Sequence, residues 1–266
     1  MSSALDPAVL SRTAALAGLG DAAICLQRLD LSGPLVTAGP QDGWAAASMI
    51  KVPLAVAAAA AVRRGTHAYG DVATVDPANL TVNDAPSPLV PGAAATLAEL
   101  ISLAVSRSDN VATNVLVDLL GRERASADLA ALGYPGTVFR RKLSGAEPLI
   151  VDPGASGRNT HPPAEAARLF AAIAAGTVPG AERLRTALAA QYWNGKLSLG
   201  LAPGDRFAHK TGDTDSISHD GGILQLAGGE TWALVVYTNQ TSGDADDYRF
   251  AAFMRALRPL LVTGTP

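Results

Sequence analysis

Charged residues are scarce in this chain of 266 residues, and cysteine is almost absent. Asp, Glu, Lys and Arg together make up 17% of the sequence, and the formal net charge at pH 7 is −3. This balance argues against nucleic acid or an anionic membrane surface as the partner. The single cysteine, Cys25, excludes an intramolecular disulfide, and its alternating apolar surroundings predict a buried structural thiol. With four histidines and no pair at ligand spacing on a helix, we expect neither a metal site nor a cofactor.

The sequence also lacks an export signal and a convincing membrane span. Its first seven residues contain neither a cationic nor an apolar region, so either the protein stays in the cytosol or a leader has been removed. The localisation therefore stays open. The longest apolar run, from Trp44 to Val62, is interrupted by Lys51 and Pro53 and is rich in weakly hydrophobic alanine. We predict a buried helix there rather than a transmembrane segment.

Extended and helical patterns divide the chain into three blocks. Asp6-Pro7 predicts a capped first helix that ends near Gly18, and strand-like segments follow at 22–30 and 35–38. The middle block is mostly helical, with clear segments at 48–64, 97–106, 111–120, 124–132, 163–175 and 181–190. Three strand candidates then occur at 206–211, 222–227 and 231–238, before a final helix over 244–261. The Gly228-Gly229 pair between the last two strands indicates a hairpin.

Both ends of the chain therefore contribute strands, while the middle forms a helical body. We predict an α/β (α+β) fold in which a five-stranded antiparallel sheet is flanked by helices and carries an inserted all-α lobe. The expected boundaries place residues 1–44 and 200–266 in a discontinuous α/β sandwich domain and residues 45–199 in the all-α domain. Neither an internal repeat nor a phosphate-binding glycine loop occurs.

Three short motifs carry the chemistry. In chain order they are Ser48-Met-Ile-Lys51, Ser108-Asp-Asn110 and Lys210-Thr-Gly212. The first places a hydroxyl and an amine one helical turn apart, and a serine nucleophile needs such an adjacent base. A lysine on an apolar helix loses hydration, which lowers its pKa and allows a free amine near neutral pH. Taken alone, the first and second motifs also fit helix caps, and Lys51 also fits a side chain that reaches solvent.

In this order, with about 60 and then about 100 residues between them, the motifs match those of class A β-lactamases and penicillin-binding proteins. The chain resembles the serine β-lactamase and penicillin-recognising hydrolase superfamily, on its class A side. The resemblance implies that Ser48 is the nucleophile and Lys51 its base. It also implies that Ser108 passes a proton to the leaving nitrogen and that Asn110 holds the substrate's side-chain amide. Asp109 fits a structural anchor.

The same resemblance makes the third motif a strand that pairs with the substrate. Lys210 and Thr211 would attract the substrate carboxylate, and Gly212 would allow close backbone approach. The backbone N–H of Asp213 would join that of the nucleophile in an oxyanion hole. The Asp213 carboxylate departs from the family pattern, because it adds negative charge beside the developing oxyanion. His219 stands near the place of a family arginine, and it either replaces that arginine in part or is a satisfied structural histidine.

Class A enzymes release their acyl-enzyme with a glutamate in an Ω-shaped loop, written E-x-x-L-N. The end of the matching segment, Arg158-Asn-Thr-His-Pro162, fits that loop, and Glu147 is the candidate base. Glu147 fits loosely, because its leucine comes two residues later rather than three and no asparagine follows at the fourth position. Glu147 is therefore either the deacylation base or a solvated carboxylate. Asp152 is the nearest alternative in the loop.

We therefore predict a serine β-lactamase-type hydrolase that opens a β-lactam amide through a Ser48 acyl-enzyme and then hydrolyses the ester. Its expected partner is a small β-lactam or a peptidoglycan-like amide or ester. One alternative is an esterase or D-amino-acid peptidase on the same fold, which the context of Glu147, Asp213 and the missing arginine favours. Another is a non-catalytic binder of peptidoglycan or β-lactams, which would predict eroded motifs.

Overall fold

Five antiparallel strands form the central sheet, in the spatial order β2-β1-β7-β6-β5. They are β1 (Ala23–Arg28), β2 (Leu35–Ala38), β5 (Arg206–Thr214), β6 (Ile217–Gln225) and β7 (Thr231–Thr238). This computed structural model describes residues 5–145 and 150–262, and within it β5 is an edge strand of the sheet. Gly229, in the turn between β6 and β7, has a φ of 103°, a conformation that favours glycine.

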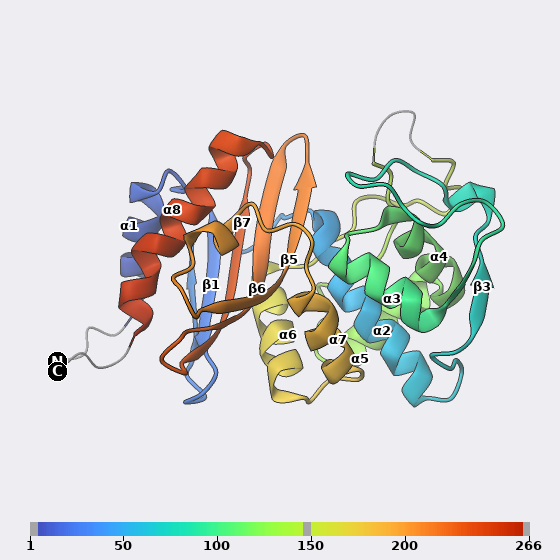
Figure 1. Ribbon diagram of the computed structural model, residues 1–266, viewed down its shortest axis with the longest axis horizontal. Helices are drawn as coiled ribbons and strands as arrows, with labels where there is room; N and C mark the ends of the chain where they lie inside the picture. Colours follow the sequence, from blue (N-terminus) through green and yellow to red (C-terminus); the bar gives the residue numbers. More distant parts are fainter. Residues whose placement is uncertain (1–4, 146–149, 263–266) are drawn as a thin grey trace.

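Helices cover both faces of this sheet (Figure 1). α1 (Pro7–Leu16) and α8 (Asp244–Leu261) lie against one face, where a cluster that includes Leu26, Leu234 and Phe253 is fully buried. α6 (Pro163–Ala175) packs against β1 and β7 from the other side. A second cluster begins at this face and continues into the helical part of the chain, so the sheet and the helices share one apolar interior.

The helical part lies beside the edge strand β5 in Figure 1. It contains α2 (Lys51–Arg63), α3 (Leu97–Ser106), α4 (Asn110–Leu120), α5 (Arg122–Ala131), α7 (Ala181–Ala189) and the short hairpin of β3 (Val72–Thr74) and β4 (Ala94–Thr96). Local chemistry fixes where these helices begin. Thr96 and Glu99 form a reciprocal capping box at α3, and the Asp109 carboxylate accepts a hydrogen bond from Ala112 N at α4. The predicted anchoring role of Asp109 is thus confirmed.

α2 is the buried axis of the helical part. All residues from Lys51 to Ala61 are buried, including a run of five alanines that lets neighbouring helices approach closely. The prediction of a buried helix in the apolar run is therefore confirmed. In the described ranges, no helix combines the length and the apolar character that a membrane span requires.

The predicted fold class is confirmed, and the predicted helices over 97–106 and 163–175 have the observed bounds. Apart from shifts of one or two residues at the ends of other elements, three details differ. The helix expected from Ser48 begins instead as a 3-10 turn, η1 (Ala47–Ile50), and two further 3-10 turns, η2 (Pro77–Asn79) and η3 (Leu197–Gly200), were not predicted. β5 and β6 are longer than expected. Gly212 in β5 permits close packing against η1, and Gly221 and Gly222 in β6 permit close packing against the neighbouring strands. The β3–β4 hairpin is too short to give a sequence pattern. The division into two domains stays a prediction.

Candidate active site

Ser48 and Lys51 meet where η1 passes into α2. In a 3-10 turn, side chains three residues apart are nearly eclipsed, which places the lysine directly below the serine. Lys51 Nζ lies 2.9 Å from Ser48 Oγ. Ala47, immediately before the serine, has a φ of 43°, a strained value for a residue with a Cβ. The backbone at Ala47 is therefore strained at the point where it positions Ser48 at the start of the helix.

Lys51 is fully buried among neutral oxygen atoms. Besides Ser48 Oγ, its Nζ contacts the Ser108 carbonyl oxygen at 2.5 Å, Ser108 Oγ at 3.0 Å and Asn110 Oδ1 at 2.7 Å. Burial, and secondarily the positive charge of Lys210, lower the Lys51 pKa well below its usual value. A free amine would donate its two hydrogens to the carbonyl and amide oxygens and turn its lone pair toward a hydroxyl. This arrangement suits a general base.

Ser108 lies between two amines. Its Oγ is 3.0 Å from Lys51 Nζ and 2.9 Å from Lys210 Nζ, and its φ of 59° turns both its carbonyl and its hydroxyl toward Lys51. Lys210 is fully buried, and burial lowers its pKa to about 7. A continuous chain of hydrogen-bonding groups therefore runs from Ser48 through Lys51 and Ser108 to Lys210.

Asn110 connects this chain to the loop that follows η2. Its Oδ1 accepts from Lys51, its Nδ2 donates to the Val82 carbonyl at 3.0 Å, and its backbone N–H donates to Asn83 Oδ1 at 2.5 Å. The amide is half-buried and retains one Nδ2 hydrogen, so it can still donate to a substrate.

The edge strand β5 runs beside Ser48. A Cβ added to Gly212 would lie 3.0 Å from Met49 N and 3.1 Å from Ser48 N, so only glycine allows the strand to come this close. An edge strand leaves alternate N–H and C=O groups unpaired, and the first N–H groups of a helical turn have no intrahelical partner. The backbone of Ser48 and the edge of β5 therefore lie close together, as the predicted oxyanion hole would require.

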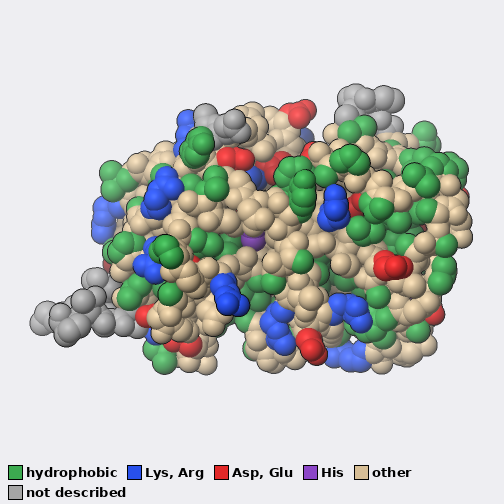
Figure 2. All heavy atoms as spheres, in the orientation of Figure 1, with side chains coloured by type: hydrophobic (Ala, Val, Ile, Leu, Met, Phe, Trp, Pro, Cys, Tyr) green, Lys and Arg blue, Asp and Glu red, His purple; other side chains and the backbone are tan. Residues whose placement is uncertain are grey.

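A hollow of about 670 Å³ opens over Ser48. Ser108, Thr211 and Gly212 line it, and Trp193 adds an aromatic wall. Carboxylates outnumber cations in this lining, which includes one lysine and the four aspartates Asp84, Asp213, Asp215 and Asp247. Figure 2 shows acidic side chains gathered around the upper ends of β5 and β6.

The carboxylate of Asp213 is neutralised by a residue that the sequence analysis missed. Lys196 Nζ lies 2.5 Å from Asp213 Oδ1, and Ser218 Oγ donates to the same oxygen at 3.0 Å. Lys196 is only 3% exposed and also donates to the His219 carbonyl. Sequence spacing gave no signal for Lys196, because the 3-10 turn η3 and the fold of β6 bring it to this place.

His219 is a satisfied structural histidine. Its Nε2 lies 3.0 Å from the Ala45 carbonyl oxygen, its Nδ1 accepts from Thr238 N at 3.3 Å, and its ring stacks on Tyr237. Burial lowers its pKa to about 4, so the ring is neutral at pH 7. Both ring nitrogens are engaged within the fold, which favours the structural role of His219 over a partial replacement of an arginine.

The loop expected to carry the deacylation base is held at its neck by Asn159, whose Oδ1 accepts from the backbone N–H groups of Arg140 and Arg141. Glu147 lies outside the described residues. Asp152 is engaged elsewhere, since it pairs with Arg122 and accepts from the Lys142 N–H at 2.7 Å. Asp152 is therefore a structural carboxylate of the loop and not a free base.

A second serine, histidine and aspartate lie in a row close to the sheet edge. His209 Nδ1 is 2.7 Å from Asp220 Oδ1, and its Nε2 is 3.0 Å from Ser198 Oγ. Ser198 does not line the hollow over Ser48, and Asn194 Oδ1 shares the same histidine nitrogen. These contacts hold η3 against β5. Within residues 5–145 and 150–262, no group of three His, Cys, Asp or Glu side chains is placed to bind a metal.

A serine hydroxyl in contact with a buried lysine amine is the arrangement expected of a serine acyl-transfer site. Residues 14–257 match a family model described as the beta-lactamase enzyme family, and the chain belongs to that family. The predicted superfamily and the prediction of a serine β-lactamase-type hydrolase are thereby confirmed. The role of each site residue stays a prediction.

Solved structures of similar fold agree with this assignment. A β-lactamase from Sphaerobacter thermophilus is 24% identical over 96% of this chain and 98% of its own, with a TM-score of 0.79. A leucine-to-glutamate variant of PBP-A was solved as its acyl-enzyme complex with penicillin G. It is 25% identical over 95% of this chain and 96% of its own, with a TM-score of 0.79. A third structure is a variant of the class A β-lactamase of the last common ancestor of Gram-negative bacteria. It is 26% identical over 94% of this chain and 97% of its own, with a TM-score of 0.79. Among curated proteins, none matches.

Proposed function

We propose that this protein is a class A-type serine β-lactamase in which Ser48 is acylated with Lys51 as the base. The observation that carries the proposal is the 2.9 Å contact between Ser48 Oγ and a lysine amine that is buried among neutral oxygens. The penicillin G acyl-enzyme of the PBP-A variant supports a β-lactam as the substrate class.

In the proposed acylation, Lys51 takes the hydroxyl proton as Ser48 Oγ attacks the lactam carbonyl carbon. The carbonyl oxygen gains negative charge and accepts hydrogen bonds from the backbone N–H groups of Ser48 and Asp213. The carbon–nitrogen bond then breaks, and Ser108 delivers a proton to the nitrogen while it recovers one from Lys51. The product is an ester on Ser48, and no cofactor is needed.

Hydrolysis of that ester requires a water molecule activated by a general base. We assign this role to Glu147, because Asp152 is already paired with Arg122. The cellular consequence expected of efficient hydrolysis is resistance to penicillins.

We further propose that Lys196 assists Lys210 and Thr211 in holding the substrate carboxylate. Lys196 lines the hollow, and its contacts with Asp213 and the His219 carbonyl use two of its three N–H donors, which leaves one for an incoming anion. Lys196→Met should raise the KM of benzylpenicillin about tenfold and leave the aspartate charge unbalanced. Asp213→Asn in the same chain should then restore part of the loss. An unchanged KM in Lys196→Met would contradict this role.

The alternative activity is that of an esterase or a D-amino-acid peptidase with the same acylation residues. Steady-state turnover of a chromogenic cephalosporin, a simple ester and a D-alanyl dipeptide separates the two. Faster turnover of the cephalosporin is the expected result. Turnover of the ester or dipeptide alone would favour the alternative, and covalent labelling without any turnover would favour a penicillin-binding protein.

A further inference from the structure

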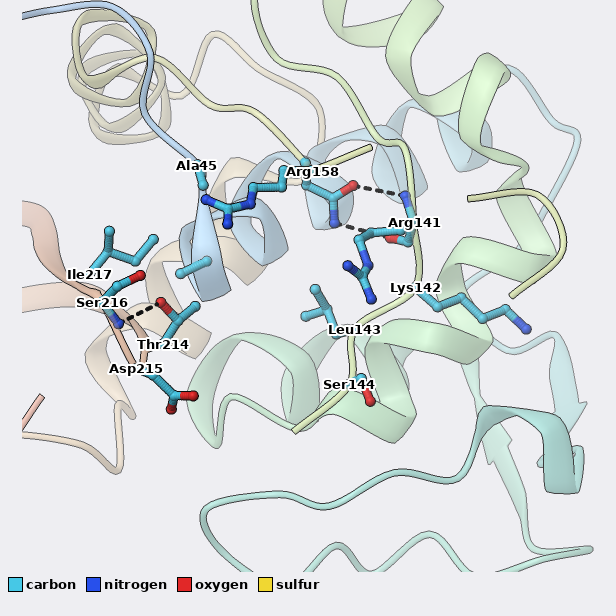
Figure 3. Close-up of a pocket in the computed structure, with 12 residues that line it drawn as sticks. Ala45, Arg141, Lys142, Leu143, Ser144, Arg158, Thr214, Asp215, Ser216 and Ile217 are labelled. Carbon is cyan, nitrogen blue, oxygen red and sulfur yellow. Dashed lines mark hydrogen bonds between the residues drawn. The ribbon is translucent and has the colours of Figure 1, made fainter. Parts of the chain in front are cut away.

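A second hollow, of about 320 Å³, lies beside the one that opens over Ser48 (Figure 3). Its walls come from three segments that are distant in sequence. They are the loop residues Arg141 to Ser144 with Arg158 and Asn159, the backbone at Ala45 and Ala47, and the β5–β6 turn from Thr214 to Ile217.

Two arginines give this hollow its charge. Figure 3 shows the Arg158 side chain extending toward Ala45 and the β5–β6 turn, and the Arg141 guanidinium extending toward Leu143. In the part of the chain that the structure describes, neither guanidinium has a hydrogen-bond or ion-pair partner. Arg141 is half-buried and Arg158 is exposed, so both remain accessible to a ligand.

The neighbouring cations of the same loop, in contrast, have hydrogen-bond or ion-pair partners within the protein. Arg140 donates to a backbone carbonyl and to a threonine hydroxyl within the loop, and Lys142 forms an ion pair with Asp118 at 2.6 Å. Lys142 points away from the hollow in Figure 3. Arg140 and Lys142 therefore stabilise the loop itself, whereas the guanidinium groups of Arg141 and Arg158 remain unpaired. Asn159 contacts only the backbone of Arg141, so the loop neck does not depend on that guanidinium.

The two hollows share a wall, because Thr214 and Asp215 line both. Lys196 lines only the hollow over Ser48, whereas Ala47 and the two arginines line only the second. Ala47 directly precedes Ser48, so the second hollow lies next to the point at which an acyl group would be bonded to Ser48. The carboxylate on the leaving-group side would stay near Lys196. The Asp215 carboxylate is exposed and points away from both arginines in Figure 3.

We propose that this second hollow is an anion-binding subsite that selects substrates with a carboxylate on the acyl side chain. Guanidinium groups bind carboxylates through paired N–H donors, and two of them around one cavity favour a dianionic substrate over a monoanionic one. The proposal rests on the proposed function, since it assumes that the acyl group is bonded to Ser48.

Three penicillins with one scaffold test this selectivity: benzylpenicillin, its α-carboxy derivative and its α-amino derivative. The expected order of kcat/KM is carboxy, then unsubstituted, then amino. Arg158→Gln and Arg141→Gln should each lower the ratio of carboxy to unsubstituted kcat/KM about tenfold, the order expected of one charge-assisted hydrogen bond. Arg12→Gln, which removes the same charge from exposed α1, is the matched control and should leave the ratio unchanged.

The preference should also shrink as salt is raised from 20 mM to 500 mM, because mobile ions screen exposed charges. A ratio near one in the native protein, or a ratio within twofold of native in the Arg141→Gln/Arg158→Gln double variant, would overturn the subsite while leaving the proposed function intact. If none of the three penicillins acylates Ser48, the proposed function fails and the subsite assignment is overturned with it.

Discussion

Buried lysines in this protein are of two kinds. Lys142 and Lys196 are nearly inaccessible to solvent, and each has a carboxylate within 2.6 Å. Lys51 is more deeply buried, yet its polar contacts are all with neutral oxygens. A charge held in the interior without a partner is costly, so burial displaces Lys51 toward its neutral form. The same burial that would destabilise a structural cation prepares Lys51 to accept a proton.

Replacing Lys51 should abolish base catalysis without preventing substrate binding. Lys51→Ala should slow acylation by a chromogenic cephalosporin about 10²–10⁴-fold, as expected for a lost general base. Acylation by the native protein should slow as pH falls, because protonation removes the lone pair, and this acid limb should disappear in Lys51→Ala. Stopped-flow rates from pH 5 to 9 measure both effects.

Lys51→Arg serves as the companion variant, because it keeps a positive charge but cannot act as a base at these pH values. It should be as slow as Lys51→Ala. A rate within threefold of native in either variant would show that Lys51 has only a structural role.

At the scale of elements, the site depends on how closely β5 approaches η1. The Gly212→Ala substitution would place a methyl group 3.0 Å from Met49 N and so separate the strand from the nucleophile. A displacement of about 1 Å in a catalytic group can cost about 10²-fold in rate. We therefore expect kcat/KM to fall by about that factor while the sheet remains folded.

Gly70→Ala is the matched control, because a Cβ at Gly70 meets no atom within 4 Å and the residue has no positive φ. It should leave kcat/KM and thermal stability unchanged. Native kcat/KM in Gly212→Ala, measured beside this control, would mean that the close approach of β5 is unnecessary for catalysis.

The loop that contains Glu147 governs the second half of the proposed reaction. If Glu147 activates the hydrolytic water, Glu147→Gln should acylate at nearly the native rate and then accumulate the ester. A burst of product followed by a stall is the expected time course. Unchanged steady-state turnover would exclude Glu147 as the base and would favour an esterase or peptidase.

At the scale of the whole molecule, the sequence predicted the architecture because local signals agree with it. The Asp6-Pro7 cap and apolar periodicity indicate the helices, and the two ends of the chain supply the strands. The features that the sequence could not predict depend on how closely distant segments pack against one another in the folded protein. The predicted strand begins at Gly222, whereas β6 begins at Ile217 and passes through Gly221 and Gly222, where the absence of a Cβ lets the neighbouring strands approach closely.

The residues of the candidate site also divide into those that a local motif predicts and those that only tertiary packing brings to the site. Ser48, Lys51 and Ser108 belong to motifs with fixed local spacing, and the structure brings them into direct contact. Lys196 belongs to no motif, and it reaches Asp213 only because η3 packs against α8 and the Leu197 N–H donates to Asp220 of β6. The neutral state of His219 likewise depends on burial that no local pattern reveals.

The central claim is that Ser48 forms an ester with a β-lactam, and intact-mass spectrometry of the whole chain tests it most directly. After brief incubation with benzylpenicillin and an acid quench, the native protein should gain the mass of one penicillin, and peptide mapping should locate it on Ser48. Ser48→Ala should show no adduct under the same conditions. Equal labelling of both proteins, or an adduct on any other residue, would contradict the account.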